Sequence, residues 1–314
     1  MQKPPVILWL TNCLRLSDNP ALAAAIKTKA PVLPVFVWPK GIDNHQGPHQ
    51  QWWLAESLTK LDADLRKAGS RLVLLQGTPA TEITKLAKQY DAKMVIHQTQ
   101  IAPREIDEAS GLHKALRKED IDPVSVRPSE LHLPEDTRNK SGGYYRVFTP
   151  FYNYLQRQSA PPEPVNAPKK IPAPESWPEN AMDLDSLISK QADHAPQGDW
   201  QPGESGALAT LKTCLDDVVE TYHDTRDQPA VQGTSRLSPH LHFGEISPRQ
   251  IYHAVHEAAI VGSATKGSEA FIRQLYWREF AHHLLFHEPQ TIDQPLQEKF
   301  THFPWRDDDA ALKR

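Results

Sequence analysis

The sequence predicts an α/β domain built on a doubly wound parallel sheet, followed by a connector and an all-α domain. In the first 127 residues, short apolar runs alternate with longer segments of helical periodicity, which is typical of a parallel sheet with helices on both faces. Residues 159–178 contain seven prolines, and helical patterns alone follow from about residue 200. We therefore expect domains at 1–127 and 201–314, joined by a proline-rich connector at 128–200.

Five apolar runs are expected to form buried strands, and the four segments between them to form helices. The predicted strands are Val6–Leu10, Val32–Val37, Leu72–Leu75, Met94–His97 and Val124–Val126. The predicted helices are Pro20–Thr28, Gln50–Ala68, Ala80–Tyr90 and Pro103–Lys118. Gly69 provides a stop for the second helix. The first strand is not followed by a Gly-x-Gly-x-x-Gly pattern, so the usual dinucleotide-binding fingerprint is absent.

The connector and the second domain have different patterns. The prolines of the connector prevent it from continuing a helix or a central strand. A flexible linker and an ordered segment laid over the surface remain equally compatible with it. In the second domain one helix is expected to begin at Ser247-Pro248, and a long aromatic-rich helix to span Ser268–His287. Another helix is expected to present one apolar face, made of Leu208, Leu211, Leu215, Val218 and Tyr222.

Composition indicates an ordinary globular protein. The 314 residues are 39% hydrophobic and 24% charged, and they contain neither a membrane-spanning run nor a signal-peptide pattern. Two distant cysteines, Cys13 and Cys214, argue against a disulfide framework. We expect a cytoplasmic monomer without a membrane partner. Because the net charge is −4, any nucleic acid must bind to a local cationic patch.

A hydroxyl-rich run at residues 233–247 contains the residue types that hold a diphosphate. Gly233 allows a tight turn, Arg236 adds a charged fork, and three hydroxyl side chains add donors. The hydroxyls belong to Thr234, Ser235 and Ser238, while Tyr222 and Arg226 lie a short distance upstream. Taken alone, the same run is also compatible with simple helix capping.

The long aromatic helix is expected to present Gln274, Trp277 and Arg278 together, with Phe271 one turn away. An indole, an amide and a guanidinium side by side are suited to a planar, hydrogen-bonding ring. The alternative is a core helix whose Arg278 pairs with a carboxylate. The spacing of His283 and His287 permits two metal ligands, but a third is lacking, so no metal site is predicted.

Four segments carry a resemblance to a known family. They are Trp9–Leu22, Tyr145–Phe151, Tyr222–Arg249 and Trp277–Phe280. In order along the whole chain, they resemble class I DNA photolyases, the cyclobutane-dimer branch, and their cryptochrome relatives. The resemblance implies a Rossmann-like N-terminal domain and a helical FAD-binding domain. It also implies light-dependent electron donation from reduced FAD to pyrimidine dimers in DNA, the carbon–carbon lyase activity of deoxyribodipyrimidine photo-lyase.

The resemblance also assigns roles to individual residues. Phe271 and Arg278 would contact FAD near its ring system, Arg226 would meet a DNA phosphate, and Trp277 would stack on the flipped-out dimer beside Gln274. Trp305 would be the surface member of an electron-transfer chain of tryptophans. The diphosphate of FAD would be held by Tyr222, Thr234, Ser235, Arg236, Leu237 and Ser238.

Three departures from the family pattern keep alternatives open. Gln274 stands where dimer-repair members usually carry glutamate, which leaves a (6-4) photolyase or a cryptochrome-like photoreceptor as alternatives. Gln51 replaces an arginine common where antenna pigments bind, so a second chromophore of folate or deazaflavin type stays undecided. Relatives also continue well past the position of Arg314. We therefore expect an incomplete FAD domain that binds FAD weakly, with an inactive fragment as the third alternative.

Overall fold

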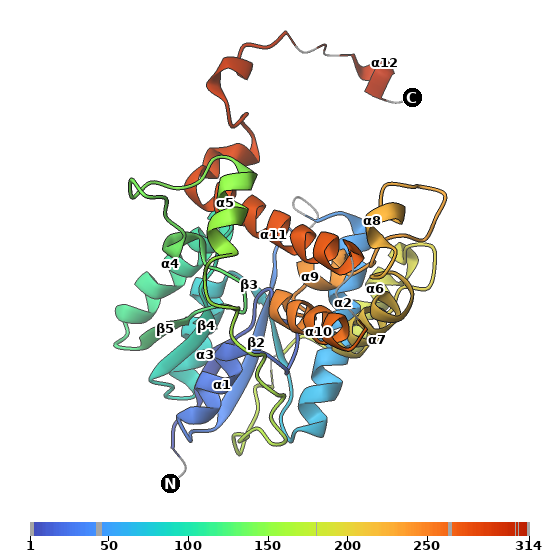
Figure 1. Cartoon of the computed structure of the whole chain (residues 1–314). Helices are drawn as coiled ribbons and strands as arrows, with labels where there is room; N and C mark the ends of the chain where they lie inside the picture. The colour runs from blue at the N-terminus through green and yellow to red at the C-terminus, as the bar shows by residue number, and fades with distance from the viewer. Residues whose placement is uncertain are drawn as a thin grey trace.

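The structure is a computed structural model that describes residues 3–41, 46–179, 181–262, 266–304, 306 and 308–312. Figure 1 shows an α/β domain with a group of helices beside it, and a C-terminal segment that extends away from both. The predicted fold class, α/β followed by all-α, is confirmed. Among the described helices, none is both long enough and apolar enough to cross a membrane.

A single parallel sheet forms the centre of the α/β domain. Its strands run in the order β3-β2-β1-β4-β5. The chain therefore starts in the middle, and the direction of winding changes between β1 and β4. In a doubly wound sheet, this is the position where ligands bind at the carboxyl ends of the strands. All five predicted strands are confirmed, as β1 (Val6–Trp9), β2 (Val32–Pro39), β3 (Val73–Gly77), β4 (Met94–Gln98) and β5 (Asp122–Val126).

Helices cover both faces of this sheet, so the inner strands are buried on both sides. Alternate residues of β1 enter different cores: Val6 and Leu8 pack with α1 and α2, whereas Ile7 and Trp9 pack with α3 and α4. Each helix starts at a proline, whose fixed φ suits the first helical turn. The four predicted helices are confirmed, as α1 (Pro20–Lys27), α2 (Pro48–Lys67), α3 (Pro79–Gln89) and α4 (Pro103–Arg117).

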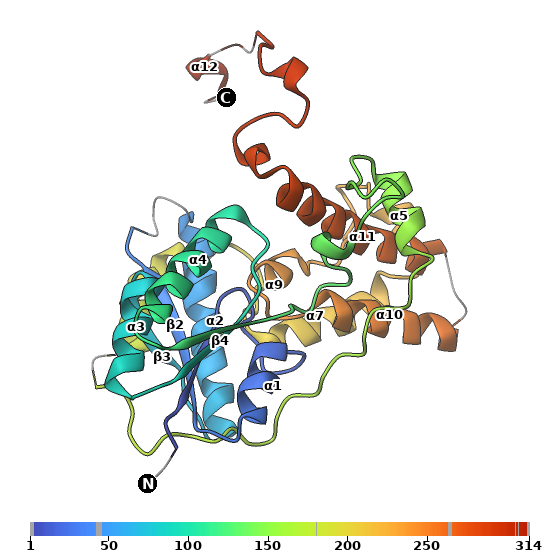
Figure 2. The same cartoon turned by 90° about the vertical axis from the view of Figure 1, so that its left-hand side faces the viewer.

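The proline-rich part of the connector is an ordered segment laid along the α/β domain, as Figure 2 shows. It lacks regular secondary structure from Gln156 to Glu179. Its backbone is nevertheless held by hydrogen bonds to the domain beneath it. These are Asp18 N to Val165 O (2.6 Å), Val32 N to Pro172 O (2.7 Å), Ile171 N to Ala68 O (2.8 Å) and Met182 N to Leu74 O (2.7 Å). The surface-wrap alternative is therefore the one that the structure adopts.

In the described part of the second half, every regular element is a helix. Its elements are α7 (Glu204–Asp217), α8 (Tyr222–Thr225), α9 (Ser238–His242), α10 (Pro248–Gly262), α11 (Lys266–His287) and α12 (Asp309–Leu312). Helix α5 (Phe148–Leu155) contributes Phe148, Phe151 and Leu155 to the same apolar core, whereas α6 (Leu184–Gln191) packs on α2.

One detail of the predicted apolar face is wrong. Helix α7 ends at Asp217, so Val218 and Tyr222 do not extend its face, and the Leu208 side chain is 44% exposed. The apolar spacing continues beyond Asp217 because both later residues enter the same core from the turn and from α8. Periodicity alone cannot distinguish that arrangement from one longer helix.

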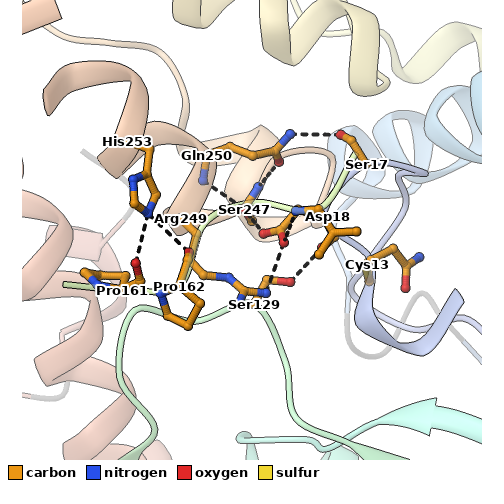
Figure 3. A network of polar contacts seen from close by, with 12 residues as sticks. Cys13, Ser17, Asp18, Ser129, Pro161, Pro162, Ser247, Arg249, Gln250 and His253 are labelled. Atoms are coloured by element: carbon orange, nitrogen blue, oxygen red, sulfur yellow. Dashed lines mark hydrogen bonds and ion pairs between the residues drawn. The ribbon is translucent and has the colours of Figure 1, made fainter. Parts of the chain in front are cut away.

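The loop between β1 and α1, residues 10–19, joins the two domains (Figure 3). Asp18 is fully buried, and its carboxylate accepts a hydrogen bond from Ser247 Oγ at 2.6 Å. The same carboxylate pairs with Arg249 at 3.1 Å. Gln250 Nε2 donates to Ser17 Oγ at 2.8 Å. The first turn of α10 is thus fixed to the loop that follows the central strand.

Gly244 brings the backbones of the two domains into direct contact. Its φ is +65°, and a Cβ atom on it would lie 2.0 Å from Asn12 O. Arg15 Nη1 donates to the Gly244 carbonyl at 2.8 Å. Because any side chain would force the backbone of Asn12 to move, only glycine fits this position without strain.

We expect Gly244→Ala to lower the free energy of unfolding by more than about 1 kcal/mol, since the substitution is both sterically blocked and strained. Urea denaturation measures this value. Gly111→Ala is the matched control, because it lies within α4 with open space around its Cβ position. That change is expected to stabilise by up to about 1 kcal/mol. Equal effects at the two glycines would contradict the close interdomain contact.

Candidate functional site

A cavity of about 600 Å³ lies between the two domains, at the carboxyl edge of the sheet beside the β1/β4 switch point. Residues from both domains form its walls. The α/β domain and the start of the connector contribute Thr11, Asn12, Gln98, Thr99, Gln100, Ile101, Ala102, Glu105, Pro128 and Glu130. The helical domain contributes Tyr222, Ser235, Leu237, Ser238, Leu241, His242, Ile251, Phe271, Gln274, Leu275, Arg278, His282 and Leu285.

The hydroxyl-rich run forms one wall of this cavity. Ser235, Leu237 and Ser238 line it, and Tyr222 lines it beside Phe271, with the two rings edge-to-face at 5.0 Å. Gly233 lets the start of the run pack directly on the backbone of Thr225, because a Cβ atom on it would lie 2.5 Å from Thr225 O. The hydroxyl groups of Tyr222, Ser235 and Ser238 therefore lie around one cavity.

Two residues of the predicted diphosphate site lie elsewhere. Thr234 is exposed and is not among the residues that line the cavity. Arg236 has a positive φ of 57°, and its guanidinium lies 4.1 Å from the centre of the Trp200 ring. A cation over an indole is a favourable contact in its own right. In this structure Arg236 thus attaches the hydroxyl-rich run to Trp200, which packs on the core of the α/β domain, whereas the prediction was that Arg236 faces a phosphate.

Helix α11 supplies the opposite wall. Gln274 and Arg278 lie one turn apart and both line the cavity. Trp277 does not share that surface: it stacks on Phe148, with ring centres 3.6 Å apart and planes within 8°. Its side chain is 44% exposed, and Arg273 lies 5.3 Å from the centre of the same Phe148 ring. The predicted group of three is therefore divided between the cavity and the adjacent surface.

Arg278 lines the cavity and also forms buried ion pairs, the carboxylate pairing that one of the two sequence interpretations predicts. Its guanidinium contacts Glu279 at 3.1 Å and Glu130 at 2.5 Å. Burial would raise the pKa of Glu130, but the charge and hydrogen bond of Arg278 prevail and lower it to about 2. Burial and the neighbouring Glu130 raise the pKa of Glu279 well above its usual value. One ionised carboxylate thus balances one guanidinium at this wall.

The cavity wall includes polar residues that the sequence did not single out. Burial, together with the charge of Arg278, lowers the pKa of His282 to about 4, so this imidazole is neutral at pH 7. Its Nδ1 is buried and has no hydrogen-bond partner within the described part of the chain. A buried polar atom on a cavity wall fits a ligand that hydrogen-bonds. Neither Glu130 nor His282 belongs to a recognisable local motif. Asn12 also lines the cavity, and its position within the N-terminal segment of the family resemblance could have indicated this.

The cavity and its walls can be compared with known proteins. Residues 6–173 match the DNA photolyase family model, and residues 271–314 match the FAD binding domain of DNA photolyase. The chain belongs to the DNA photolyase family. A deoxyribodipyrimidine photo-lyase of Agrobacterium fabrum is 37% identical over all of this chain and 66% of the relative. This chain therefore spans about two thirds of the length of that curated relative.

Solved structures of photolyases and cryptochromes share the arrangement of both domains. A bacterial class III photolyase from Agrobacterium tumefaciens is 36% identical, with a TM-score of 0.90 over all of this chain and 65% of that one. A cryptochrome from Synechocystis is 25% identical, with a TM-score of 0.86 over all of this chain and 68% of that one. Both photolyases and cryptochromes are thus similar to this chain.

A second, smaller cavity lies next to the first in this photolyase-family chain. It measures about 360 Å³ and reaches the carboxyl ends of β1, β2 and β3. Asn12 Nδ2 donates to Glu105 Oε1 within the wall between the two cavities, and burial raises the pKa of Glu105. The side chains that line both cavities are Thr11, Asn12, Gln100, Glu105 and His242. Gln51, which departs from the family pattern, is buried and donates to Gln46 O at 2.9 Å.

The remaining predicted residues are placed as follows. Arg226 lies 5.9 Å from the centre of the Tyr222 ring and 3.5 Å from the Asp227 carboxylate. Trp305 lies outside the described residues. His283 accepts a hydrogen bond from Tyr145 N at 3.1 Å. Within the described part of the chain, no group of three or more potential ligands could hold a metal ion.

The buried histidines of α11 should make stability depend on pH. Burial, with help from His287 and Arg138, lowers the pKa of His283 to about 4 from an ordinary 6.5. Between these values the unfolded chain binds more protons, so stability falls as pH falls through this window. We expect His283→Gln, whose side-chain carbonyl can still accept from Tyr145 N, to make the decline shallower, by at most about 1.4 kcal/mol per pH unit.

Urea denaturation between pH 7 and pH 4.5 measures this slope. The exposed His223→Gln is the matched control and should leave it close to that of the original chain. An unchanged slope in His283→Gln would show that this imidazole does not stay neutral when the protein folds.

Proposed function

We propose that this chain forms the FAD-binding cavity of an enzyme that repairs cyclobutane pyrimidine dimers in DNA with light, a deoxyribodipyrimidine photo-lyase. The observation that carries the proposal is the interdomain cavity itself. Hydroxyl groups line one wall, and an amide, a neutral imidazole and a charge-balanced arginine line the other. Its volume of about 600 Å³ lies in the range of small-molecule sites, roughly 300–1,000 Å³.

The lining side chains match the chemical parts of FAD. Ser235, Ser238 and Tyr222 can donate hydrogen bonds to a diphosphate, which accepts at every oxygen. Gln274 suits the edge of a heterocyclic ring, as does Nδ1 of His282, which has no hydrogen-bond partner among the described residues. When bound and reduced, FAD supplies the electron that light transfers to the dimer. The task of the chain is to hold the cofactor and exclude water around it.

The neighbouring surface supports a DNA partner. Trp277 is partly exposed and stacked on Phe148, with the Arg273 guanidinium over the same ring. Exposed aromatic rings accept the faces of unstacked bases, and nearby arginines contact phosphates. A damaged base pair is already poorly stacked, which lowers the cost of flipping it out towards Trp277. Arg273 thus places a positive charge beside the exposed indole, in a chain whose net charge is −4.

A cryptochrome-like photoreceptor is the second candidate, and a specific residue favours it. Gln274 lines the cavity where repair members carry glutamate, and an amide cannot share a proton with a dimer radical anion as a carboxyl group can. The same residue leaves (6-4) repair open. The similarity to a class III photolyase supports a repair enzyme, and the similarity to a cryptochrome supports a photoreceptor. Because the chain spans 66% of its curated relative, repair by this chain is itself part of the proposal.

The second cavity is the candidate site for an antenna chromophore. Its volume of about 360 Å³ and its position beside the first cavity suit a planar pigment close to FAD. The wall between the cavities contains the Asn12–Glu105 pair, so ligands on its two sides would lie within a few side chains of each other. Folate and deazaflavin remain the two pigment types that the sequence leaves open.

We expect Ser238→Ala to weaken FAD binding about tenfold, the loss of ~1.4 kcal/mol that one hydrogen bond to a charged group contributes. Quenching of FAD fluorescence on titration with the purified chain measures the dissociation constant. Ser189→Ala, on the exposed face of α6, is the control and should bind FAD as the original chain does. Lack of binding by the original chain would rule out the FAD proposal. Equal binding by both variants would show that the diphosphate does not bind at Ser238.

The substitution Gln274→Glu separates cyclobutane-dimer repair from the two alternatives. If the remaining chemistry is that of a dimer-repair enzyme, the carboxyl group should raise the quantum yield of repair several-fold, up to about tenfold. Illumination of the FAD-loaded chain with a thymine-dimer oligonucleotide measures it as recovered absorbance at 260 nm. Gln274→Ala is the comparison. If neither chain repairs the oligonucleotide while FAD remains bound, the photoreceptor or (6-4) alternative is favoured.

A further inference from the structure

Glu245 lies at the centre of a second joint between the domains, behind the hydroxyl-rich wall. The side chain is completely buried, and donors from three parts of the chain converge on it. Oε1 accepts from Trp53 Nε1 at 3.0 Å, from Gly203 N at 2.7 Å, and from Ser57 Oγ. Trp53 and Ser57 belong to α2 of the α/β domain, whereas Gly203 precedes α7. One carboxylate therefore connects the two domains.

The other oxygen of Glu245 faces the helix that carries part of the cavity wall. Oε2 contacts Nδ1 of His240, whose side chain is as deeply buried. Nε2 of the same imidazole lies 3.4 Å from Thr210 Oγ1 on α7. His240 sits in the middle of α9, and three of its four companions in that helix line the cavity. These are Ser238, Leu241 and His242.

Aromatic stacking attaches the same segment to α2. Trp53 stacks on Phe243 with planes within 9°, and it meets Trp200 edge-to-face at 5.6 Å. Trp200 in turn lies under the Arg236 guanidinium. The segment from Arg236 to Phe243 is thus held at both ends by contacts that converge on Trp53, and in the middle by Glu245.

A carboxylate is the side chain that this environment requires. Its two oxygens only accept hydrogen bonds, and four groups that can donate surround them: an indole, a backbone amide, a hydroxyl and an imidazole. An amide of the same shape places an N–H group towards one of those donors. That mismatch is costly where water is absent.

We propose that Glu245 is a positioning residue for the cofactor-binding wall: through His240 it fixes the orientation of α9, and hence of Ser238 and His242, against the α/β domain. The role in cofactor binding rests on the proposed function, whereas the fixing of α9 does not. The residue is not expected to touch the ligand, since it is absent from the cavity lining. Its effect on binding is exerted entirely through the geometry of the wall.

The experiment compares Glu245→Gln with Glu204→Gln. Glu204 is a matched control because its carboxylate also joins the domains, accepting from Leu16 N at 2.6 Å and Ser17 N at 3.0 Å. Neither of these partners lies on α9 or lines the cavity. Amide hydrogen exchange of the chain without ligand measures local opening. Fluorescence titration with FAD measures affinity, and thermal unfolding measures overall stability.

We expect Glu245→Gln to accelerate hydrogen exchange in residues 233–243 and to weaken FAD binding about tenfold. Glu204→Gln should accelerate exchange near residues 14–18 and leave FAD affinity within about twofold. Equal exchange in residues 233–243 for both variants would overturn the positioning role, whatever happens to FAD. Faster exchange there with unchanged FAD affinity would overturn its link to the cofactor. Failure of the original chain to bind FAD would overturn the proposed function and leave the exchange result to decide the positioning role.

A second pair of variants decides the question if Glu245→Gln does not fold. In His240→Asn the amide nitrogen takes the place of Nδ1 and can still donate to Glu245, whereas in His240→Gln the amide takes the place of Nε2. We expect residues 233–243 to exchange more slowly in His240→Asn than in His240→Gln, with thermal stabilities compared in parallel. Equal exchange in both would overturn the role of the Glu245–His240 contact.

Discussion

The contact between the β1–α1 loop and the helical domain is the constraint on which the candidate site depends. The cavity is not contained in either domain; it exists because the carboxyl edge of the sheet is held against α9, α10 and α11. Asp18 fixes the start of α10. Gly244 has no side chain, so the backbone of the helical domain can approach the backbone of Asn12. Since Asn12 itself lines the cavity, the joint and the site share the same short loop. Loosening the Gly244–Asn12 contact would therefore deform the cavity wall.

Buried charge is arranged so that this joint and the cavity wall remain compatible with a dry interior. Asp18 pairs with Arg249, and Arg278 lies between Glu130 and Glu279. Isolated charges at these depths would be very costly, whereas paired and hydrogen-bonded ones are tolerated. Because the pKa of Glu279 is raised, the cluster at the wall carries little net charge, and an anionic ligand does not face an uncompensated carboxylate there.

Much of the fold and some of the site could be predicted from local patterns. Strands and helices of the α/β domain follow from apolar runs and from helix-starting prolines, which act over a few residues. Ser235 and Ser238, which the sequence assigned to a diphosphate site, both line the cavity, and their role there stays a prediction. The sequence did not predict that Arg236 would turn onto Trp200, because the two are separated by 36 positions and only the packed structure brings them together. The roles of Trp277 and Trp305 stay predictions.

The sequence by itself determined the two fold classes, the order of the elements in the α/β domain and the family, since these depend on periodicity and on motifs contiguous in the chain. Only the tertiary structure decided that the proline-rich connector is an ordered wrap, and which members of each motif face the cavity. It also brought in Glu130 and His282, which belong to no local pattern, and it gave Glu245 a contact across the domains that the hydroxyl-rich run around it does not indicate. The physical reason is that a cavity between domains is defined by contacts across long sequence separations, and those contacts select among side-chain directions that local geometry leaves equally open.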